Sequence, residues 1–92
     1  MNCFYLAGRI VNIENKNNYA IVTINIPRYY KNKEGYYEYD NIRVIVKGNI
    51  RDSVVEFCKS GDVIGVTGTI QSLKTYYRFL ATKVSYLSAK ID

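Results

Sequence analysis

The chain has 92 residues, 48% of them hydrophobic, which is enough for one folded domain over residues 1–92 but not for two. Thirteen Lys and Arg against eight Asp and Glu give a net charge of +5, which favours nucleic acid, acidic proteins or anionic membranes as partners. The sequence contains no His, the commonest acid–base group and metal ligand at neutral pH. We therefore expect neither an enzyme nor a metal or cofactor site.

No run of residues is long and apolar enough to cross a bilayer, and the N-terminus lacks a basic leader followed by an apolar stretch. We therefore expect a cytoplasmic protein without a membrane segment. The two cysteines, Cys3 and Cys58, do not have the Cys-x-x-Cys spacing of metal and redox sites. They are predicted to be two free thiols.

Two strands are predicted before Pro27. Residues 4–11 alternate between apolar and polar positions, and Gly8 is expected to mark a bend. A polar, Asn-rich turn leads to a second alternating segment over residues 19–26. Its inward-facing residues are Ala20, Val22, Ile24 and Ile26. Pro27 is expected to end the pairing, and residues 28–35 to form a polar, basic connection.

A third strand is predicted over about residues 36–47, with two different faces. One face is apolar and contains Ile42, Val44 and Val46. The other is aromatic and basic and contains Tyr37, Tyr39, Asn41, Arg43, Ile45 and Lys47. Glu38 and Asp40 lie opposite the tyrosines of this face, and we expect them to be solvated or paired with Lys or Arg.

Residues 50–58 carry apolar side chains at helical spacing, which predicts one short helix with Asn49 as its N-cap and Asp52 in its first turn. Two more strands are predicted over residues 63–71 and about 76–87, joined by a tight turn. This order of elements is typical of an all-β OB fold, a five-stranded Greek-key barrel with a helix between strands 3 and 4. OB folds bind oligonucleotides or oligosaccharides on one face.

The positive charge is concentrated in two segments. Residues 28–47 carry five basic and three acidic residues, and residues 72–92 carry four and one, whereas residues 48–71 carry two and three. The first segment interleaves basic residues with five of the ten tyrosines: Arg28, Tyr29, Tyr30, Lys31, Lys33, Tyr36, Tyr37, Tyr39, Arg43 and Lys47. The second contains Lys74, Tyr76, Tyr77 and Arg78. Basic groups neutralise phosphates and aromatic rings stack on bases, so both segments are suited to single-stranded nucleic acid.

The chain resembles the bacterial single-stranded DNA-binding proteins. The segments that carry the resemblance are Asn2 with Leu6–Ile10, Tyr30–Gly35, Ile42–Gly48, Val54–Asp62 and Val66–Gln71. The resemblance implies that Tyr30 is a base-stacking aromatic, that Arg43 lies in the binding groove, and that Lys59 and Lys74 lie along the DNA path. It also implies a homo-oligomer, a dimer or a tetramer, in which Tyr5 and Tyr19 could form the interface.

The chain departs from the family at three positions. Asn41, Lys47 and Thr75 stand where well-studied members have stacking aromatics, and the neighbouring Tyr37, Tyr39, Tyr76 or Tyr77 could substitute for them. The loops are short for the family, which implies a small site size. The sequence ends at Ile91–Asp92 without the Gly- and Gln-rich linker and the acidic tip of the family. This ending is expected of a truncated form or of a minimal member.

The sequence thus predicts a sequence-independent single-stranded DNA-binding protein of DNA replication, recombination or repair, with replication proteins as further candidate partners. The predicted contact residues are Arg28, Tyr30, Lys31, Lys33, Tyr37, Tyr39, Arg43, Lys47, Lys59, Lys74, Tyr76 and Tyr77. The alternative is a PriB-like primosomal or protein-interaction module whose tyrosine-rich face binds a protein. The sequence leaves open the preference for DNA or RNA, the oligomeric state and the site size.

Overall fold

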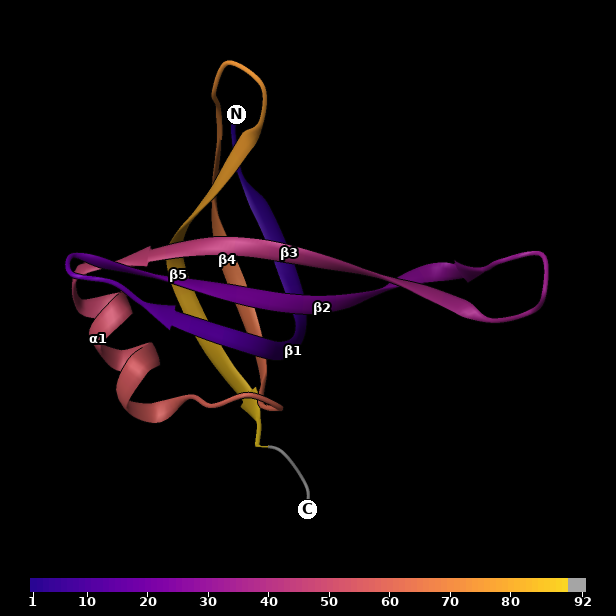
Figure 1. Ribbon diagram of the computed structural model, residues 1–92, viewed down its shortest axis with the longest axis horizontal. Helices are drawn as coiled ribbons and strands as arrows, with labels where there is room; N and C mark the ends of the chain where they lie inside the picture. The colour runs from indigo at the N-terminus through magenta and orange to yellow at the C-terminus, as the bar shows by residue number, and fades with distance from the viewer. Residues whose placement is uncertain (90–92) are drawn as a thin grey trace.

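A computed structural model describes residues 1–89 of the chain. The elements are β1 (Phe4–Asn15), β2 (Tyr19–Lys31), β3 (Tyr37–Lys47), α1 (Gly48–Phe57), β4 (Val63–Ser72) and β5 (Tyr77–Ser88). The strands form one closed barrel in the order β1-β2-β3-β5-β4, and β1 also pairs with β4 (Figure 1). All pairings are antiparallel except the short one between β3 and β5. The predicted all-β barrel with one helix between strands 3 and 4 is confirmed.

The barrel core is built from alternate residues of the strands, because successive side chains of a strand point to opposite faces of the sheet. The most deeply buried strand residues are Ile10, Ala20, Val22, Ile24, Val44, Val46, Ile64 and Val66. Val54 is the buried residue of α1 and packs with this cluster. The core therefore uses the inward-facing set that the alternation in residues 19–26 and 42–46 predicts.

Two hairpins continue past the barrel in different directions (Figure 1). Within residues 1–89, β1 pairs with β2 no further than Asn25, so residues 26–42 form a two-stranded ribbon, the β2–β3 arm. Ile26 and Ile42, at its base, still pack against the core. In the same way β1 pairs with β4 no further than Gly68, and residues 69–78 form the β4–β5 arm. The arms spread the chain over 43 × 40 Å, although it is only 22 Å thick.

The structure corrects the expectation that Pro27 ends the second strand. Pro27 pairs with Tyr39, and β2 continues to Lys31, so residues 28–35 are not a polar connection. Pro27 is tolerated because it lies beyond the end of the β1 pairing, on a strand edge where no neighbouring strand needs its missing N–H group. The long paired arm is the consequence.

Gly8 does not mark a bend, because it pairs in register with Ile64. The irregularity of β1 lies between Ile10 and Asn12, where β1 has one residue more than β2. Gly8 instead allows β1 and β2 to approach closely: a Cβ atom there would collide with the main-chain oxygen of Asn25.

The helix begins earlier than the sequence pattern indicated. Its N-cap is Lys47 and not Asn49, and Asp52 lies beyond its first turn. Gly48 has a φ of +58°, a conformation that glycine adopts at little cost, so the chain turns into the helix directly after β3. None of the helices within residues 1–89 has the length and apolar composition to span a membrane.

Gly68 provides a test of the packing between β4 and β5. A Cβ atom at Gly68 would collide with the main-chain oxygen of Leu80 and lie 2.7 Å from Cε2 of Phe4. We expect Gly68→Ala to lower the free energy of unfolding by about 1–3 kcal/mol in urea denaturation. Gly65→Ala is the control, because the atoms nearest to its Cβ would belong to the Tyr5 side chain, which is 62% exposed and can move away. Equal losses in the two variants would contradict this account.

Candidate nucleic-acid interface

The outward face of β2 and β3 is continuous from the barrel to the end of the β2–β3 arm. Residues opposite one another in paired strands share a face. The opposed pairs on this face are Tyr19 and Lys47, Ile21 and Ile45, Thr23 and Arg43, Asn25 and Asn41, Pro27 and Tyr39, and Lys31 and Tyr37. The predicted separation of β3 into an apolar and an aromatic, basic face is confirmed, since Val44 and Val46 are buried and Tyr39 and Lys47 are exposed.

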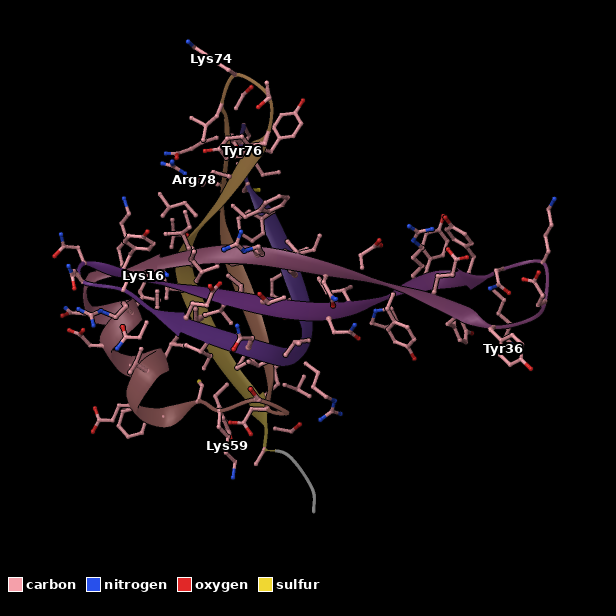
Figure 2. All side chains as sticks on the ribbon, in the orientation of Figure 1. Lys16, Tyr36, Lys59, Lys74, Tyr76 and Arg78 are labelled. Carbon is pink, nitrogen blue, oxygen red and sulfur yellow. The ribbon has the colours of Figure 1, made fainter. Side chains whose placement is uncertain are left out.

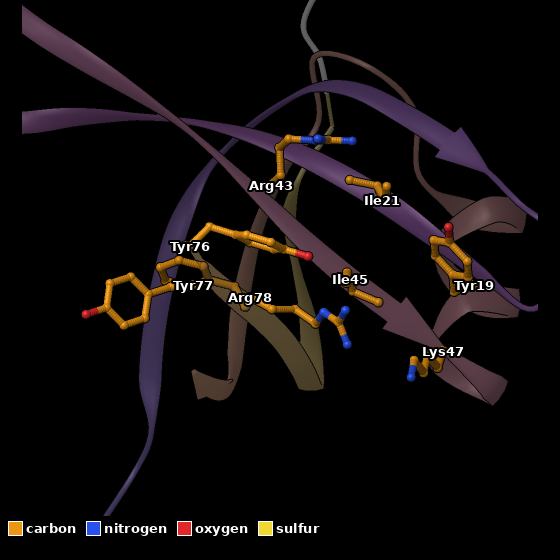
Figure 3. A pocket seen from close by; sticks show the side chains of 9 residues that line it. Tyr19, Ile21, Arg43, Ile45, Lys47, Tyr76, Tyr77 and Arg78 are labelled. Carbon is orange, nitrogen blue, oxygen red and sulfur yellow. The ribbon is translucent and has the colours of Figure 1, made fainter. Parts of the chain in front are cut away.

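A groove of about 480 Å³ lies where this face meets the beginning of β5 (Figure 3). β2 contributes Tyr19 and Ile21, β3 contributes Arg43, Ile45 and Lys47, and the last part of the chain contributes Tyr76, Tyr77, Arg78 and Phe79. The groove therefore combines isoleucines and aromatic rings with three cations. Such a lining can hold a flat apolar ring while an attached anionic group lies beside a cation.

The side chains from the beginning of β5 have two orientations. Figure 3 shows the Tyr76 ring and the Arg78 side chain extending toward Ile45, while the Tyr77 ring points away from it. Tyr76 and Arg78 thus reach across the face of β3. Tyr77 lines the outer margin of the groove.

The predicted contact residues fall into several groups. The groove contains Arg43, Lys47, Tyr76 and Tyr77. The same face continues along the β2–β3 arm with Tyr39, Tyr37 and Lys31, and Lys33 lies in the turn at the end of this arm. Lys74 lies at the end of the β4–β5 arm, whereas Lys59 lies at the opposite end of the molecule (Figure 2). The structure therefore does not bring Lys59 together with the other predicted residues.

Comparison with solved structures identifies the barrel. The chain is similar to a small single-stranded DNA-binding protein from Mycoplasma pneumoniae, with 17% identity, 99% of each chain covered and a TM-score of 0.77. It is also similar to the Plasmodium falciparum SSB in a complex with ssDNA, with 16% identity, 96% of each chain covered and a TM-score of 0.73.

A small single-stranded DNA-binding protein from Streptomyces coelicolor gives 10% identity over 91% of this chain and 90% of the other, with a TM-score of 0.67. The chain has the OB fold. The resemblance predicted from the sequence is thereby confirmed for the fold. No protein-family model and no curated protein matches the sequence.

Several residues that line the groove are not among the predicted contact residues. Tyr19 is expected from the resemblance at a subunit interface, but the register of β2 with β3 places it opposite Lys47. Arg78 follows the predicted Tyr76 and Tyr77 and could have been included on that ground. Phe79 packs against the core and also lines the groove, and its parallel pairing with Val44 of β3 is a contact that no local pattern indicates.

The cations near this face differ in their partners. Arg43 Nη2 lies 3.2 Å from Glu14 Oε2 of β1, and Lys31 Nζ lies 5.6 Å from the centre of the Tyr37 ring. Within residues 1–89, Lys47, Lys74 and Arg78 form no ion pair. These last three are therefore available to an external anion without displacing a carboxylate of the chain.

Arg28 is engaged by carboxylates, as the position of Glu38 and Asp40 in the sequence allowed. Its Nε and Nη2 donate to the two carboxylate oxygens of Asp40, each at 3.1 Å, and its Nη1 donates to Glu38 at 2.8 Å. The hydrogen bonds from Arg28 hold the pKa of Asp40 below its usual range, and Asp40 in turn raises the pKa of Arg28. Arg28 thus has two carboxylate partners where Arg43 has one, and it differs from Lys47 and Lys74, which form no ion pair within residues 1–89.

A second groove, of about 420 Å³, lies between α1 and β5 and has a different character. Its lining includes Ile50, Val54, Phe57, Cys58, Val84 and Tyr86, and it contains no charged residue. Burial and the nearby Asp62 raise the pKa of the Cys58 thiol and of the Tyr86 phenol. This groove lacks the cations that a polyanion requires.

Residues 1–89 contain no cluster of three or more His, Cys, Asp or Glu side chains able to hold a metal ion.

Both cysteines are free thiols, as predicted, and they differ in exposure. Cys3 is exposed, whereas Cys58 is partly buried and has a raised pKa, so a smaller fraction of Cys58 is thiolate at a given pH. We expect iodoacetamide at about pH 8 to alkylate Cys3 several-fold faster than Cys58, as peptide mass spectrometry can measure. The difference should narrow as the pH rises through the pKa of Cys58. Faster alkylation of Cys58 would contradict this expectation.

Proposed function

We propose that this OB domain binds single-stranded DNA without sequence preference. The observation that carries the proposal is the groove between β3 and β5, where Tyr76 and Ile45 lie beside the unpaired cations Lys47 and Arg78. The three solved structures reported above support it, since each is described as a protein that binds single-stranded DNA.

The proposed path follows the outward face of β2 and β3. A base stacks on Tyr76 in the groove, and Lys47 and Arg78 neutralise the adjoining phosphates. The strand then continues along the β2–β3 arm, where Tyr39 and Tyr37 offer further rings. Stacking and phosphate contacts do not distinguish base edges, so binding is independent of sequence. Paired bases in a duplex hide their faces from the rings, so a duplex competes poorly.

We also propose the cellular role of the protein. It serves DNA replication, recombination or repair in the cytoplasm. It acts as a homo-oligomer, without catalytic activity and without a cofactor. Residues 1–92 act as a single domain. We place Lys59 outside the binding path, because it lies at the end of the molecule away from Lys74 (Figure 2).

A titration of labelled oligo-dT at several salt concentrations, with a duplex of equal length as competitor, tests the function. We expect tight binding that the duplex does not displace and that weakens as salt rises, with a slope that reports the number of phosphate contacts. No binding at low salt would refute the proposal and favour a protein partner for the tyrosine-rich face.

Tyr76→Ala tests the stacking in the groove. We expect it to lower the affinity for oligo-dT roughly fivefold to 150-fold, equivalent to about 1–3 kcal/mol for one stacked base. Tyr86→Ala is a matched control, because the two tyrosines are similarly exposed, at 58% and 53%, and Tyr86 lines the uncharged second groove. Fluorescence anisotropy gives both affinities, and equal losses would contradict the placement of the site.

Glu14→Gln tests the competition for Arg43. The variant removes the carboxylate that holds Arg43 at 3.2 Å, so the guanidinium becomes free for phosphate. We expect the affinity for oligo-dT to rise roughly two- to fivefold, in keeping with the small free energy of exposed ion pairs. Glu56→Gln makes the same change in net charge on α1, away from the groove, and should have little effect. An equal rise in both variants would show that only net charge matters.

A further inference from the structure

The β2–β3 arm contains an irregularity at its most aromatic point. Pro27 lies opposite Tyr39 and Lys31 opposite Tyr37, so β2 advances four residues while β3 advances two. Three residues of β2, Arg28, Tyr29 and Tyr30, therefore lie opposite one residue of β3, Glu38. Such a bulge disrupts the ladder of hydrogen bonds between the strands and changes the direction of the side chains.

The two tyrosines of this bulge form an exposed aromatic pair. The rings of Tyr29 and Tyr30 are 5.2 Å apart and nearly perpendicular, at 86°. The exposed fractions are 93% for Tyr29 and 53% for Tyr30, so burial in the barrel does not fix either ring. A base-stacking surface made of mobile residues pays an ordering cost on binding, and a fixed one does not.

Arg28 supplies the contact that ties the bulge to β3. Its guanidinium makes a fork of two hydrogen bonds to Asp40 and a third to Glu38, on the facing strand. Arg28 directly precedes the tyrosine pair, so these bonds fix the backbone at the start of the bulge. The planar fork is specific to arginine, because the ammonium group of lysine offers no matching pair of parallel donors.

The charges around Arg28 argue against a direct contact with phosphate. One guanidinium faces two carboxylates, so the cluster carries a net charge of −1. A phosphate approaching Arg28 meets this negative charge and must compete with Asp40 for the same donors. In contrast, the unpaired Lys47 and Arg78 present no carboxylate to an incoming strand.

We propose that Arg28 is a positioning residue, which locks the bulge so that Tyr29 and Tyr30 are presented as a ready-made stacking surface for a base beyond the groove. This inference rests on the proposed binding of single-stranded DNA. It assigns to Arg28 an indirect role in place of the phosphate contact that the sequence predicted.

Arg28→Lys separates the two roles, because it keeps the charge and removes the fork. We expect its affinity for oligo-dT to fall about fivefold or more, with an unchanged dependence on salt. A phosphate contact would survive this change, since lysine binds phosphate as a point charge. Lys83→Arg, a charge-conserving change at an exposed position of β5 outside the groove and outside the predicted contact residues, is the matched control and should bind as the unchanged protein does.

A double variant tests whether Arg28 acts through the tyrosines. If it positions Tyr30, then Arg28→Lys combined with Tyr30→Ala should bind about as weakly as the more damaging single variant. Losses that multiply would overturn the proposal, and so would normal binding by Arg28→Lys. Asp40→Asn tests the direction of the change in affinity. We expect weaker binding of oligo-dT, although the variant removes a negative charge, because the fork from Arg28 is lost. Tighter binding would show that the freed Arg28 contacts phosphate.

NMR of the free protein separates failure of this inference from failure of the proposed function. Contacts between the Tyr29 and Tyr30 rings should be present in the unchanged protein and in Lys83→Arg, and lost in Arg28→Lys. If the unchanged protein does not bind oligo-dT, the proposed function is refuted, and so is the proposal that Tyr29 and Tyr30 stack on a base. If it binds but the ring contacts survive in Arg28→Lys, only the positioning role is refuted.

Discussion

The short parallel contact between β3 and β5 is the interaction on which the rest of the structure depends. It consists of two opposed pairs, Val44 with Phe79 and Ile45 with Leu80, and it closes the barrel. Closure buries Val44 in the core and, one residue further, leaves Ile45 facing outward into the groove. It also brings the beginning of β5, with Tyr76 and Arg78, over the face of β3. One contact therefore completes the hydrophobic core and creates the groove.

The arms carry exposed aromatic residues, while the barrel carries the core. The buried apolar residues lie in the barrel strands and α1, and the isoleucines at the bases of the arms, Ile26, Ile42 and Ile70, pack against them. The aromatic residues of the arms are largely exposed, with Tyr29 and Tyr77 among the clearest cases. An exposed ring contributes little buried apolar area to folding, so the arms can carry many tyrosines without becoming part of the core. The free strand edges of the β2–β3 arm are accompanied by Pro27 and a cluster of charged residues, features that discourage pairing with another chain.

Carboxylates of the chain divide its cations into two classes. Arg28 and Arg43 are held by Glu38, Asp40 and Glu14, while Lys47, Lys74 and Arg78 carry no ion pair within residues 1–89. Net charge alone does not make this distinction, because all five residues count equally toward it. The distance between each cation and the nearest carboxylate decides which of them can exchange counterions for phosphates. The placement of acidic residues is thus as informative about the site as the placement of basic ones.

The sequence by itself determined the features that depend on near neighbours in the chain. The alternation in residues 37–47 indicated which face of β3 is buried, and the order of the periodic segments indicated the barrel, because side chains of a strand alternate with a period of two. The tertiary structure alone decided that Phe79 lies beside Val44, that Lys59 is remote from Lys74, and that Arg28 is held across a bulge. These relations depend on register and closure between segments far apart in the sequence, where shifting a strand by one residue moves every side chain to the other face.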